Sequence, residues 1–369
     1  MEVCVSNQKQ EKEVENKLSD QHKGEIRSGK NKMVGKQSIE FGIPVRIRCS
    51  ASVVGKKEGQ GPLGHLFDKV CTDDTFGTKS WEAAESALQK ETVELCLQKS
   101  NKEIEDIRYL FAGDLLGQCI ASSFGLAEFN TPLFGLYGAC STSALSITLG
   151  SITIAAGVAD NVMCVTSSHF ASAEKEFRFP LEYGNQRPLS ASWTVIGSGA
   201  FLLSGAASQN DRAMITAVTP GRIVDYGLKD SMNMGMCMAP AAANVIYNHL
   251  KDFKRKPEYY DKIITGDLGH VGKQGVIDLL KQKGFDISQQ HMDCGIEIFD
   301  QVTQDTHAGG SGCGCAASVL SAYILKQLEE KQWKRVLFVP TGALLSKVSF
   351  NEGNSVPGIA HAVVIEAVQ

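Results

Sequence analysis

The chain has 369 residues, of which 43% are hydrophobic and 21% charged, with 37 Lys and Arg against 41 Asp and Glu. At roughly 100–200 residues per domain, this length predicts two domains with a sizeable core, which excludes a disordered or fibrous protein. Because positive and negative charges nearly balance, no overall positive field is present to attract nucleic acid, and we expect no nucleic-acid partner.

The cysteines and the first residues of the chain indicate the kind of cellular compartment in which we expect the protein. Eleven cysteines form an odd set without a paired C-x-x-C repeat, so neither a disulfide framework nor a zinc ribbon is expected. We therefore expect a reducing compartment, no bound metal and no cofactor. No basic-then-apolar stretch opens the chain, so no signal peptide is expected either.

The N-terminal region differs in composition from the rest. Residues 1–34 carry 13 charges and no aromatic side chain. Such a segment does not bury enough apolar surface to offset its ordering entropy. We predict a disordered tail over 1–34, followed by an N-terminal half over 35–209 and a C-terminal half over 210–369.

The spacing of apolar residues in the first half predicts alternating strands and helices, with a turn between one element and the next. A strand, a helix and a strand ending in a Gly-Asp-Leu corner come first, followed by a glycine-rich turn that opens a helix, and then two strands. In chain order these elements are predicted at 44–54, 80–98, 105–118, 138–151, 161–168 and 201–205. The segment from Phe170 to Thr194 between the last two is predicted to be a long functional or subunit-contacting loop.

The second half repeats the same order of elements. The matching segments are 214–224, 239–253, 260–272, 309–325, 335–345 and 361–368. The repeat predicts an α/β fold of two duplicated βαβαββ halves, whose sheets stack with helices buried between and outside them. Asp114 and Asp267 occupy matching Gly-Asp-Leu corners.

An uncharged stretch from Phe129 to Ala159 is long enough to raise the question of a membrane span. Pro132, Gly135 and Gly138 interrupt it before the G-A-C-S-T turn. A spanning helix needs about 20 mostly apolar residues without such a break. We therefore predict a buried strand followed by a buried helix, and no transmembrane helix.

Cys140 lies where the extended run T-P-L-F-G-L-Y-G-A gives way to that buried helix. Free backbone N–H groups at a helix N-terminus favour a thiolate, so Cys140 is a candidate nucleophile or ligand contact. An ordinary core cysteine is the alternative.

The duplication and the G-A-C-S-T turn resemble the thiolase-like superfamily, which includes ketoacyl synthases and thiolases. The resemblance implies a five-layer α-β-α-β-α fold with a nucleophilic cysteine at this corner, paired with His or Asn from the second half. Here the corner reads T-G-D-L-G-H, with Asp267 near the expected His and His270 three residues later. The turn expected to supply Asn reads G-S-G-C, with Ser311 and Cys313 there.

Two functions remain open at this point. Cys140 could carry an acyl group in an acyltransferase or condensing enzyme, with His270 or His307 as a displaced base. An aspartate at the corner works against this, because an oxyanion needs neutral or cationic donors. The other function is non-enzymatic binding in the same pocket. His169, which follows a strand, is expected to be structural or pocket-lining.

Longer strings carry a closer resemblance. E-G-Q-G-P-L-G-H-L-F-D-K at 58–69, T-S-S-H-F-A-S-A-E-K-E-F-R-F-P-L-E-Y-G at 166–184 and T-G-A-L-L-S at 341–346 are similar to the stage V sporulation protein AD family of spore-forming bacteria. This resemblance implies binding of dipicolinic acid or its calcium chelate for uptake into the forespore, with roles in sporulation and germination. It also implies a peripheral place at the inner spore membrane beside membrane proteins of the same sporulation operon.

The resemblance also implies a ligand site in the old active-site pocket. The candidate ligand residues are Asp114, Cys140, Asp267, His307, Ser311 and Cys313. Arg178 and Arg187 are further candidates, because guanidinium groups pair well with carboxylates. Thiolase-like proteins pair through a sheet edge, so we expect a homodimer and place strand 161–168 at that edge.

Overall fold

The computed structural model describes residues 29–177 and 186–368. Most of the predicted tail lies outside these ranges. Its last residues do not: Lys32–Val34 form strand β1, which pairs antiparallel with the start of β2. The prediction of disorder is therefore wrong at 32–34, where a tight turn folds the chain back onto β2.

The elements of the first half appear in the predicted order. They are β2 (Ser38–Val54), α3 (Trp81–Ser100), β4 (Tyr109–Gly113), α4 (Ile120–Leu126), β5 (Leu133–Gly135), α5 (Thr142–Ala155), β6 (Asn161–Ser168), α6 (Phe170–Phe177), β7 (Trp193–Thr194) and β8 (Gly197–Ser204). The Ser80 side chain caps α3 by accepting a hydrogen bond from the Ala83 amide. Asn101, in the left-handed conformation, ends that helix.

The second half follows with the same plan. It comprises β9 (Ala213–Thr219), α7 (Met234–Asp252), β10 (Lys262–Thr265), α8 (Gly269–Gln282), β11 (His291–Asp293), α9 (Cys294–Glu297), β12 (Gly310–Ser311), α10 (Cys313–Val319), the π-helical turn η7 (Leu320–Ile324), α11 (Leu325–Glu329), β13 (Arg335–Val339), β14 (Thr341–Ala343), α12 (Lys347–Asn351), β15 (Gly358–Ala360) and β16 (Ala362–Glu366).

Strand order and direction repeat between the halves. In the first half β4 lies between β5 and β6 and runs parallel to both, while β8 is antiparallel to β6 and β2. In the second half β10 lies between β11 and β13 and runs parallel to both, while β16 is antiparallel to β13 and β9. The predicted duplication of a βαβαββ unit is confirmed.

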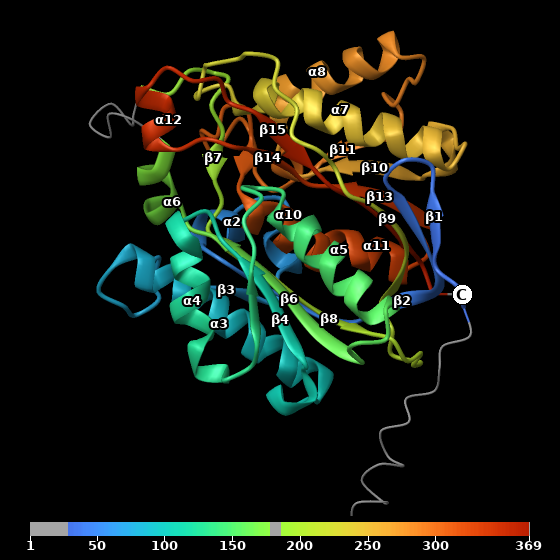
Figure 1. Cartoon of the computed structure of the whole chain (residues 1–369). Coiled ribbons are helices and arrows are strands. Elements are labelled where there is room, and N and C mark those ends of the chain that lie inside the picture. Colours follow the sequence, from blue (N-terminus) through green and yellow to red (C-terminus); the bar gives the residue numbers. More distant parts are fainter. Residues whose placement is uncertain (1–28, 178–185, 369) are drawn as a thin grey trace, which may run out of the picture.

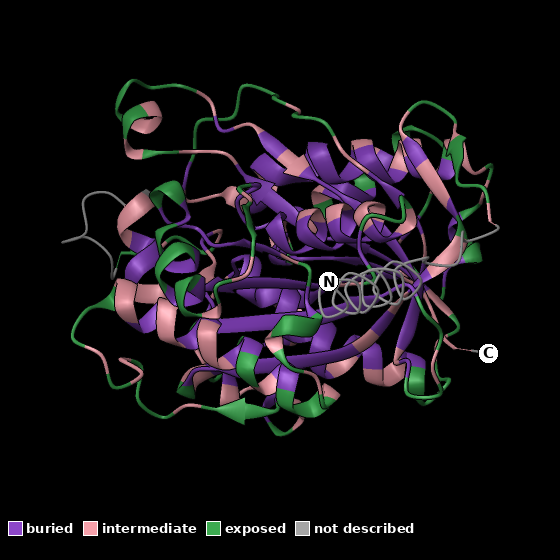
Figure 2. Cartoon of the chain, turned by 60° about the horizontal axis from the view of Figure 1, so that its bottom comes forward, coloured by how far each residue is buried: buried purple, intermediate pink, exposed green. Residues whose placement is uncertain are grey.

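The layers also follow the prediction, as Figure 1 shows. Helices α3 and α4 cover the outer face of the first-half strands, and α7 and α8 cover the outer face of the second-half strands. Helices α5, α10 and α11 lie between the two sheets, with α10 in contact with α5, β6 and β8. In Figure 2 these central helices and most strands are buried, as the five-layer arrangement requires.

The two sheets are joined at one seam. Strand β2 is 17 residues long; its early part pairs with β9 and its later part with β8. The register shifts between Glu40 and Val45 and again between Ile47 and Cys49. Such irregularities increase local twist, which lets one hydrogen-bonded sheet fold over the central helices.

Small residues set the spacing of the central layer. A Cβ at Gly314 of α10 would lie 2.1 Å from the Gly197 carbonyl oxygen of β8, and one at Gly199 would lie 2.7 Å from Ala317. Neither position has room for a larger side chain. The close approach of α10 to β8 therefore depends on glycine in both elements.

Three expectations about individual segments need comment. The segment from Phe170 to Thr194 is not simply a loop, because it contains α6 and β7, and β7 pairs with β12. Strand β6 is not at a sheet edge, because β4 and β8 pair with its two sides; the strands at the two ends of the sheet are β5 and β11. The uncharged stretch forms β5 and α5, and no helix of the described residues is long and apolar enough to cross a membrane.

Candidate functional site

Cys140 lies in a tight turn between β5 and α5. Ala139 before it has φ +48°, a left-handed conformation that is strained for a residue with a Cβ. The hydroxyls of Ser141 and Thr142 donate to the carbonyls of Gly138 and Ala139 at 2.6 Å, which fixes the turn. The side chain of Cys140 is buried at the start of the central helix, as the sequence predicts.

Asp267 faces Cys140 from the second half. It follows β10, and its carboxylate accepts hydrogen bonds from the Gly312 amide at 2.9 Å and the Thr341 hydroxyl at 2.8 Å. The Cys140 thiol interacts with it, which raises the pKa of Cys140 and lowers that of Asp267. Burial raises the pKa of Asp267 to about 7, although these hydrogen bonds lower it.

The thiol of Cys140 is held in its neutral form. Burial, followed by the nearby charges of Asp267 and Cys313, raises the pKa of Cys140 well above its ordinary value of 9.0. The helix N-terminus favours a thiolate, but desolvation and a neighbouring carboxylate outweigh it here. The site therefore pairs a protonated thiol with an acid that titrates near neutral pH.

The glycine-rich turn at 309–313 meets the same site. Gly312 has φ +109°, and a Cβ there would lie 2.5 Å from the Ser168 hydroxyl oxygen, so glycine is required. This conformation turns the Gly312 amide toward Asp267. Cys313 is fully buried, and its thiol donates to the Ser167 carbonyl at 2.9 Å.

A small cavity opens above Cys140, with a volume of about 30 Å³. Both halves supply its walls, which are mainly apolar with a few polar groups. The lining residues are Leu115, Tyr137, Ala139, Cys140, Glu176, Met234, Ser311, Ala343 and Leu345. This volume is close to that of one water molecule, so a larger ligand has to displace side chains at the mouth.

Asp114 does not line this cavity. Its carboxylate accepts hydrogen bonds from the amides of Leu116 and Ser122 and from the Ser122 hydroxyl, at 2.6–2.9 Å. It is fully buried, and burial raises its pKa. Asp114 therefore holds the turn that leads into α4, and the structure does not bring it to the cavity with Cys140.

The candidate histidines also lie away from the cavity walls. His270 is an exposed residue in the first turn of α8. The ring of His307 contacts the Pro188 carbonyl at 2.9 Å and Asp305 at 3.1 Å. His169 is buried with its Nε2 at 2.7 Å from the Asp74 carbonyl, which is a structural contact. Neither His270 nor His307 is placed to act as a base for Cys140.

Of the two candidate arginines, Arg187 is described and does not line the cavity. Arg187 pairs with Asp305 at 2.8 Å and lies over the Trp193 ring. Arg178 lies outside the described residues. Among residues 29–177 and 186–368, no group of three or more His, Cys, Asp or Glu side chains is arranged to hold a metal ion.

Sequence reasoning missed Thr341, Tyr137 and Glu176 as parts of the site. Thr341 orients Asp267, while Tyr137 and Glu176 line the cavity. Thr341 begins the T-G-A-L-L-S string, just after the buried strand that ends at Val339. This position after a strand is the sequence feature that could have identified Thr341 as a site residue. Glu176 comes from α6, within the segment that was predicted to be a loop.

Comparisons with known proteins agree with this fold. The family model described as stage V sporulation protein AD matches residues 35–366. Stage V sporulation protein AD of Bacillus subtilis (strain 168) is 42% identical over 335 residues, covering 91% of this chain and 98% of its own.

Solved structures are similar at much lower identity, and this likeness concerns the fold alone. Cerulenin-bound OleA of Xanthomonas campestris has a TM-score of 0.56 and 12% identity, over 90% of this chain and 100% of that one. Human mitochondrial 3-ketoacyl-CoA thiolase in complex with CoA has a TM-score of 0.54 and 13% identity, over 88% and 98%. The fold is therefore thiolase-like, and the chain belongs to the stage V sporulation protein AD family.

Proposed function

We propose that this chain is a non-enzymatic protein of thiolase-like fold that binds dipicolinic acid, or its calcium chelate, for uptake into the developing spore. The observation that carries the proposal is the replacement of the expected donors around Cys140. The partner of its thiol is Asp267, and the nearby Gly312 amide already donates to that aspartate. An acyl-transfer site needs the opposite arrangement, with free donors aimed at an oxyanion.

Dipicolinate is a flat aromatic dianion, and we propose that the Cys140 thiol and the Ser311 hydroxyl donate to one carboxylate. Asp267 does not line the cavity but lies beside Cys140, and in its protonated form it places no repelling charge near the ligand. The apolar side chains of Leu115 and Leu345 lie against the ring. Because the cavity volume is only about 30 Å³, entry of the ring requires Tyr137, which is 49% exposed, to swing outward. For the chelate, we propose that Glu176, which lines the cavity, supplies a further carboxylate oxygen to calcium.

Calorimetric titration of the full chain with dipicolinate, with and without calcium, tests this proposal. We expect binding by the wild type and at least tenfold weaker binding by Ser311→Ala and by Leu345→Trp, which fills the cavity. Val302→Ala, at a residue that is 91% exposed, is the control. Absence of binding by a folded wild type contradicts the function, while unchanged binding by both cavity variants contradicts the site.

One observation favours the acyltransferase alternative: Cys140 lies in the strained turn at the start of the central helix α5. Intact-mass analysis after exposure to acyl-CoA of several chain lengths tests it. An adduct that disappears in Cys140→Ala would support acyl transfer. We expect no adduct, because the thiol is neutral at physiological pH.

We also propose that the protein is a homodimer formed along β5. This strand is one of the two edges of the sheet, and it exposes Leu133 and Phe134, with Tyr137 exposed just beyond it. Phe134 stacks on Phe111 at 4.9 Å between ring centroids, so it is held in place. Unpaired edges with exposed apolar side chains favour pairing with another strand. A second copy would continue the sheet across this edge.

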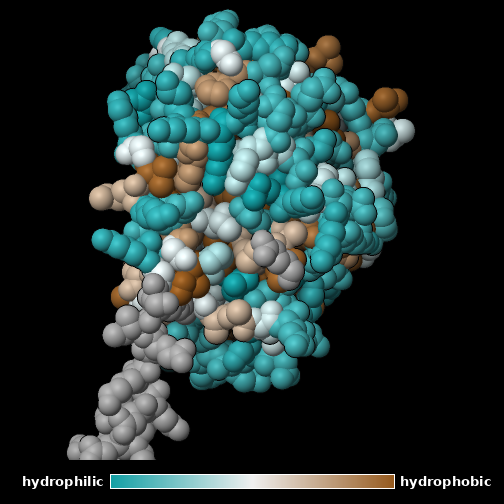
Figure 3. All heavy atoms as spheres, turned by 90° about the vertical axis from the view of Figure 1, so that its right-hand side faces the viewer, coloured by the Kyte–Doolittle hydropathy of each residue, from teal (hydrophilic) through white to brown (hydrophobic). Residues whose placement is uncertain are grey.

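We further propose that the protein lies peripherally at the inner spore membrane, with membrane proteins of the same sporulation operon as partners. The surface turned toward the viewer in Figure 3 is largely hydrophilic, with small hydrophobic groups between polar ones. Such a face favours attachment through protein contacts over insertion into lipid. Fractionation of spores tests this: the protein should leave the membrane fraction when the partner membrane proteins are deleted, and its retention without them contradicts the proposal.

A further inference from the structure

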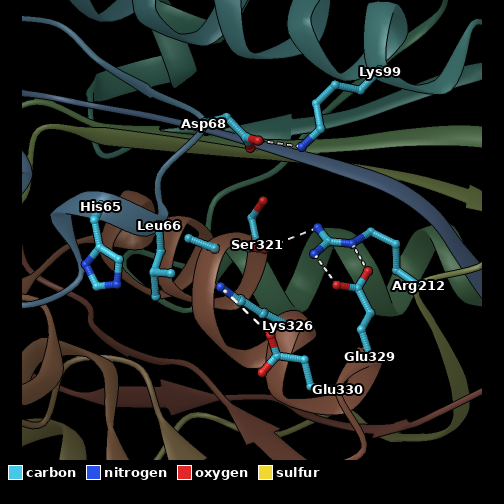
Figure 4. Close-up of a pocket in the computed structure, with 10 residues that line it drawn as sticks. His65, Leu66, Asp68, Lys99, Arg212, Ser321, Lys326, Glu329 and Glu330 are labelled. Atoms are coloured by element: carbon cyan, nitrogen blue, oxygen red, sulfur yellow. Dashed lines mark hydrogen bonds and ion pairs between the residues drawn. The ribbon is translucent and has the colours of Figure 1, made fainter.

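A second and much larger cavity lies at the other end of the central helices. Its volume is about 310 Å³, within the range of about 300–1,000 Å³ that is typical of small-molecule sites. Its walls come from the segment after β2, the end of α3, the start of β9, and the turn η7 with α11 (Figure 4). The lining residues are His65, Leu66, Asp68, Lys99, Arg212, Ser321, Ala322, Lys326, Glu329 and Glu330. We call it the seam pocket; it shares no lining residue with the Cys140 cavity.

One wall of the seam pocket contains the π-helical turn. Residues Leu320–Ile324 interrupt the regular helix between α10 and α11. Arg212 donates to the Ser321 carbonyl at 3.2 Å, and the Ser321 hydroxyl lies 2.7 Å from that of Ser50. These contacts fix the widened turn against β2. π-Helical turns occur frequently at functional sites, and this one places Ser321 and Ala322 in the pocket wall.

Two of the three carboxylates of the pocket, Asp68 and Glu329, are already paired with cations. Asp68 accepts hydrogen bonds from the Ser52 amide at 2.9 Å and from Lys99 at 2.6 Å. Glu329 receives Arg212 through both of its oxygens. Figure 4 shows the Asp68–Lys99 pair on one side of the pocket and the Arg212–Glu329 pair on the other.

The lysines retain unused donors. An ammonium group has three N–H donors, and the hydrogen bond of Lys99 to Asp68 uses one of them. Lys326 Nζ lies 3.9 Å from Glu330, beyond hydrogen-bond distance, and its side chain is 44% exposed. Among the described residues the pocket therefore offers spare donors on two facing elements, α3 and α11.

The thiol of Cys49 responds to the same positive charges. A hydrogen bond with Cys96 is the main cause of its lowered pKa, and burial opposes this effect; the charges of Lys99 and Arg212 lower the pKa further, whereas the charge of Asp68 raises it. Cys49 lies on β2 below the pocket. Lys99 and Arg212 therefore act on the Cys49 thiol through their positive charge, and Asp68 acts against them.

We propose that the seam pocket is a second ligand site, for a small organic dicarboxylate held between Lys99 on α3 and Lys326 on α11. The apolar body of the ligand lies against Leu66 and Ala322, and Arg212 supplies a fixed positive charge behind it. The site is separate from the Cys140 cavity and stands whether or not that cavity binds dipicolinate. Dipicolinate is a suitable probe, because it carries two carboxylates on one ring.

Lysine footprinting tests the seam pocket without any substitution. The full chain is acetylated with and without dipicolinate, and modification of each lysine is measured by mass spectrometry. We expect at least fivefold protection of Lys99 and Lys326, and none of Lys281, an exposed lysine of α8 that is paired with Asp286. Equal modification with and without dipicolinate overturns the proposal, and equal protection by inorganic phosphate overturns the assignment to a dicarboxylate.

Calorimetry of variants then separates the two sites. Lys99→Gln with Lys326→Gln should remove one binding event and leave the event that Ser311→Ala and Leu345→Trp affect, with Lys281→Gln as the matched control. If the lysine variant abolishes all binding and the cavity variants bind as the wild type does, the result supports the seam pocket and contradicts the Cys140 site. If the lysine variant is folded and binds with wild-type stoichiometry and affinity, the seam-pocket proposal is overturned.

Discussion

At the scale of single residues, the structure separates two aspartates that the sequence makes equivalent. Asp114 and Asp267 follow matching strands in Gly-Asp-Leu corners. In the first half Asp114 itself accepts the amides of the following turn. In the second half Asp293, at the end of the neighbouring strand β11, accepts the Leu268 and Gly269 amides instead. Asp267 is thereby free to face Cys140, which a linear motif does not reveal.

The reactivity of Cys140 provides a test at this scale. Because the pKa of its thiol is raised, first by burial and then by Asp267, alkylation by iodoacetamide at pH 7.5 should be much slower than that of Cys71, which is partly exposed. Asp267→Asn should accelerate the reaction of Cys140 severalfold and leave Cys71 unchanged. Rates are measured by mass spectrometry of the peptides. Rapid alkylation of wild-type Cys140 would mean that it is a thiolate.

Asp267 also predicts a pH dependence of stability. Its pKa is about 7 in the folded protein against 3.8 ordinarily, so the folded state binds the proton more tightly and loses stability as pH rises from about 4 to 7. Asp267→Asn removes this loss. Its free energy of unfolding should therefore exceed that of the wild type increasingly up to pH 7, by on the order of 4 kcal/mol, and by a constant amount above it.

Denaturant unfolding of both proteins at several pH values measures this difference. A difference that does not change between pH 4 and pH 7 would show that Asp267 is not titrating in this range. Other buried acids, such as Glu58 with a pKa of about 8, affect both proteins equally and cancel in the comparison.

At the scale of elements, the sequence predicts most helices and strands because their patterns are local. The small residues of α5 and α10 indicate close packing, and the structure brings α10 against β8 through Gly314 and Gly197. Helix α6 could not be predicted in the same way, because its segment is rich in charged residues and its contacts are with distant elements. Thr194, next to it on β7, shares a hydrogen bond with Glu174 of α6 at 2.9 Å.

Packing of α10 can be tested by adding one methyl group. In Gly314→Ala the new Cβ would lie 2.1 Å from the Gly197 carbonyl oxygen, so helix and strand have to separate. We expect a loss of about 2 kcal/mol or more in the free energy of unfolding. Gly117→Ala is the matched control, because nothing lies within 4 Å of its Cβ position. Equal stability of the two variants would contradict the close approach.

At the scale of the whole molecule, the internal repeat gives the fold class without reference to any other protein, since six segments recur in the same order in the two halves. What the repeat does not give is which strand lies at an edge. Strand β6 is uniformly buried and reads like any central strand, whereas β5 is only three residues long. The sequence therefore predicts the wrong edge strand, and we propose the dimer contact at β5 in place of β6.

The proposed dimer can be tested by its mass in solution. Phe134→Lys places a charge on the exposed edge of β5, where Phe134 is 48% exposed in the single chain. We expect the dimer to dissociate at least tenfold more readily in sedimentation experiments. Val302→Lys, on a residue that is 91% exposed and away from β5, should leave the mass unchanged. A wild-type monomer at all concentrations would refute the interface.

The central claim is that the cavity at Cys140 binds a dianionic ligand while the Cys140 thiol and the neighbouring Asp267 are both uncharged. Its most direct test is the affinity for dipicolinate at pH 6 and pH 8, in the wild type and in Asp267→Asn. With the pKa of Asp267 near 7, the protonated fraction falls about tenfold over this interval, and the wild-type dissociation constant should rise about tenfold. Asparagine carries no charge at either pH, so the variant should bind equally at both. A wild-type affinity that is the same at pH 6 and pH 8 would contradict the account.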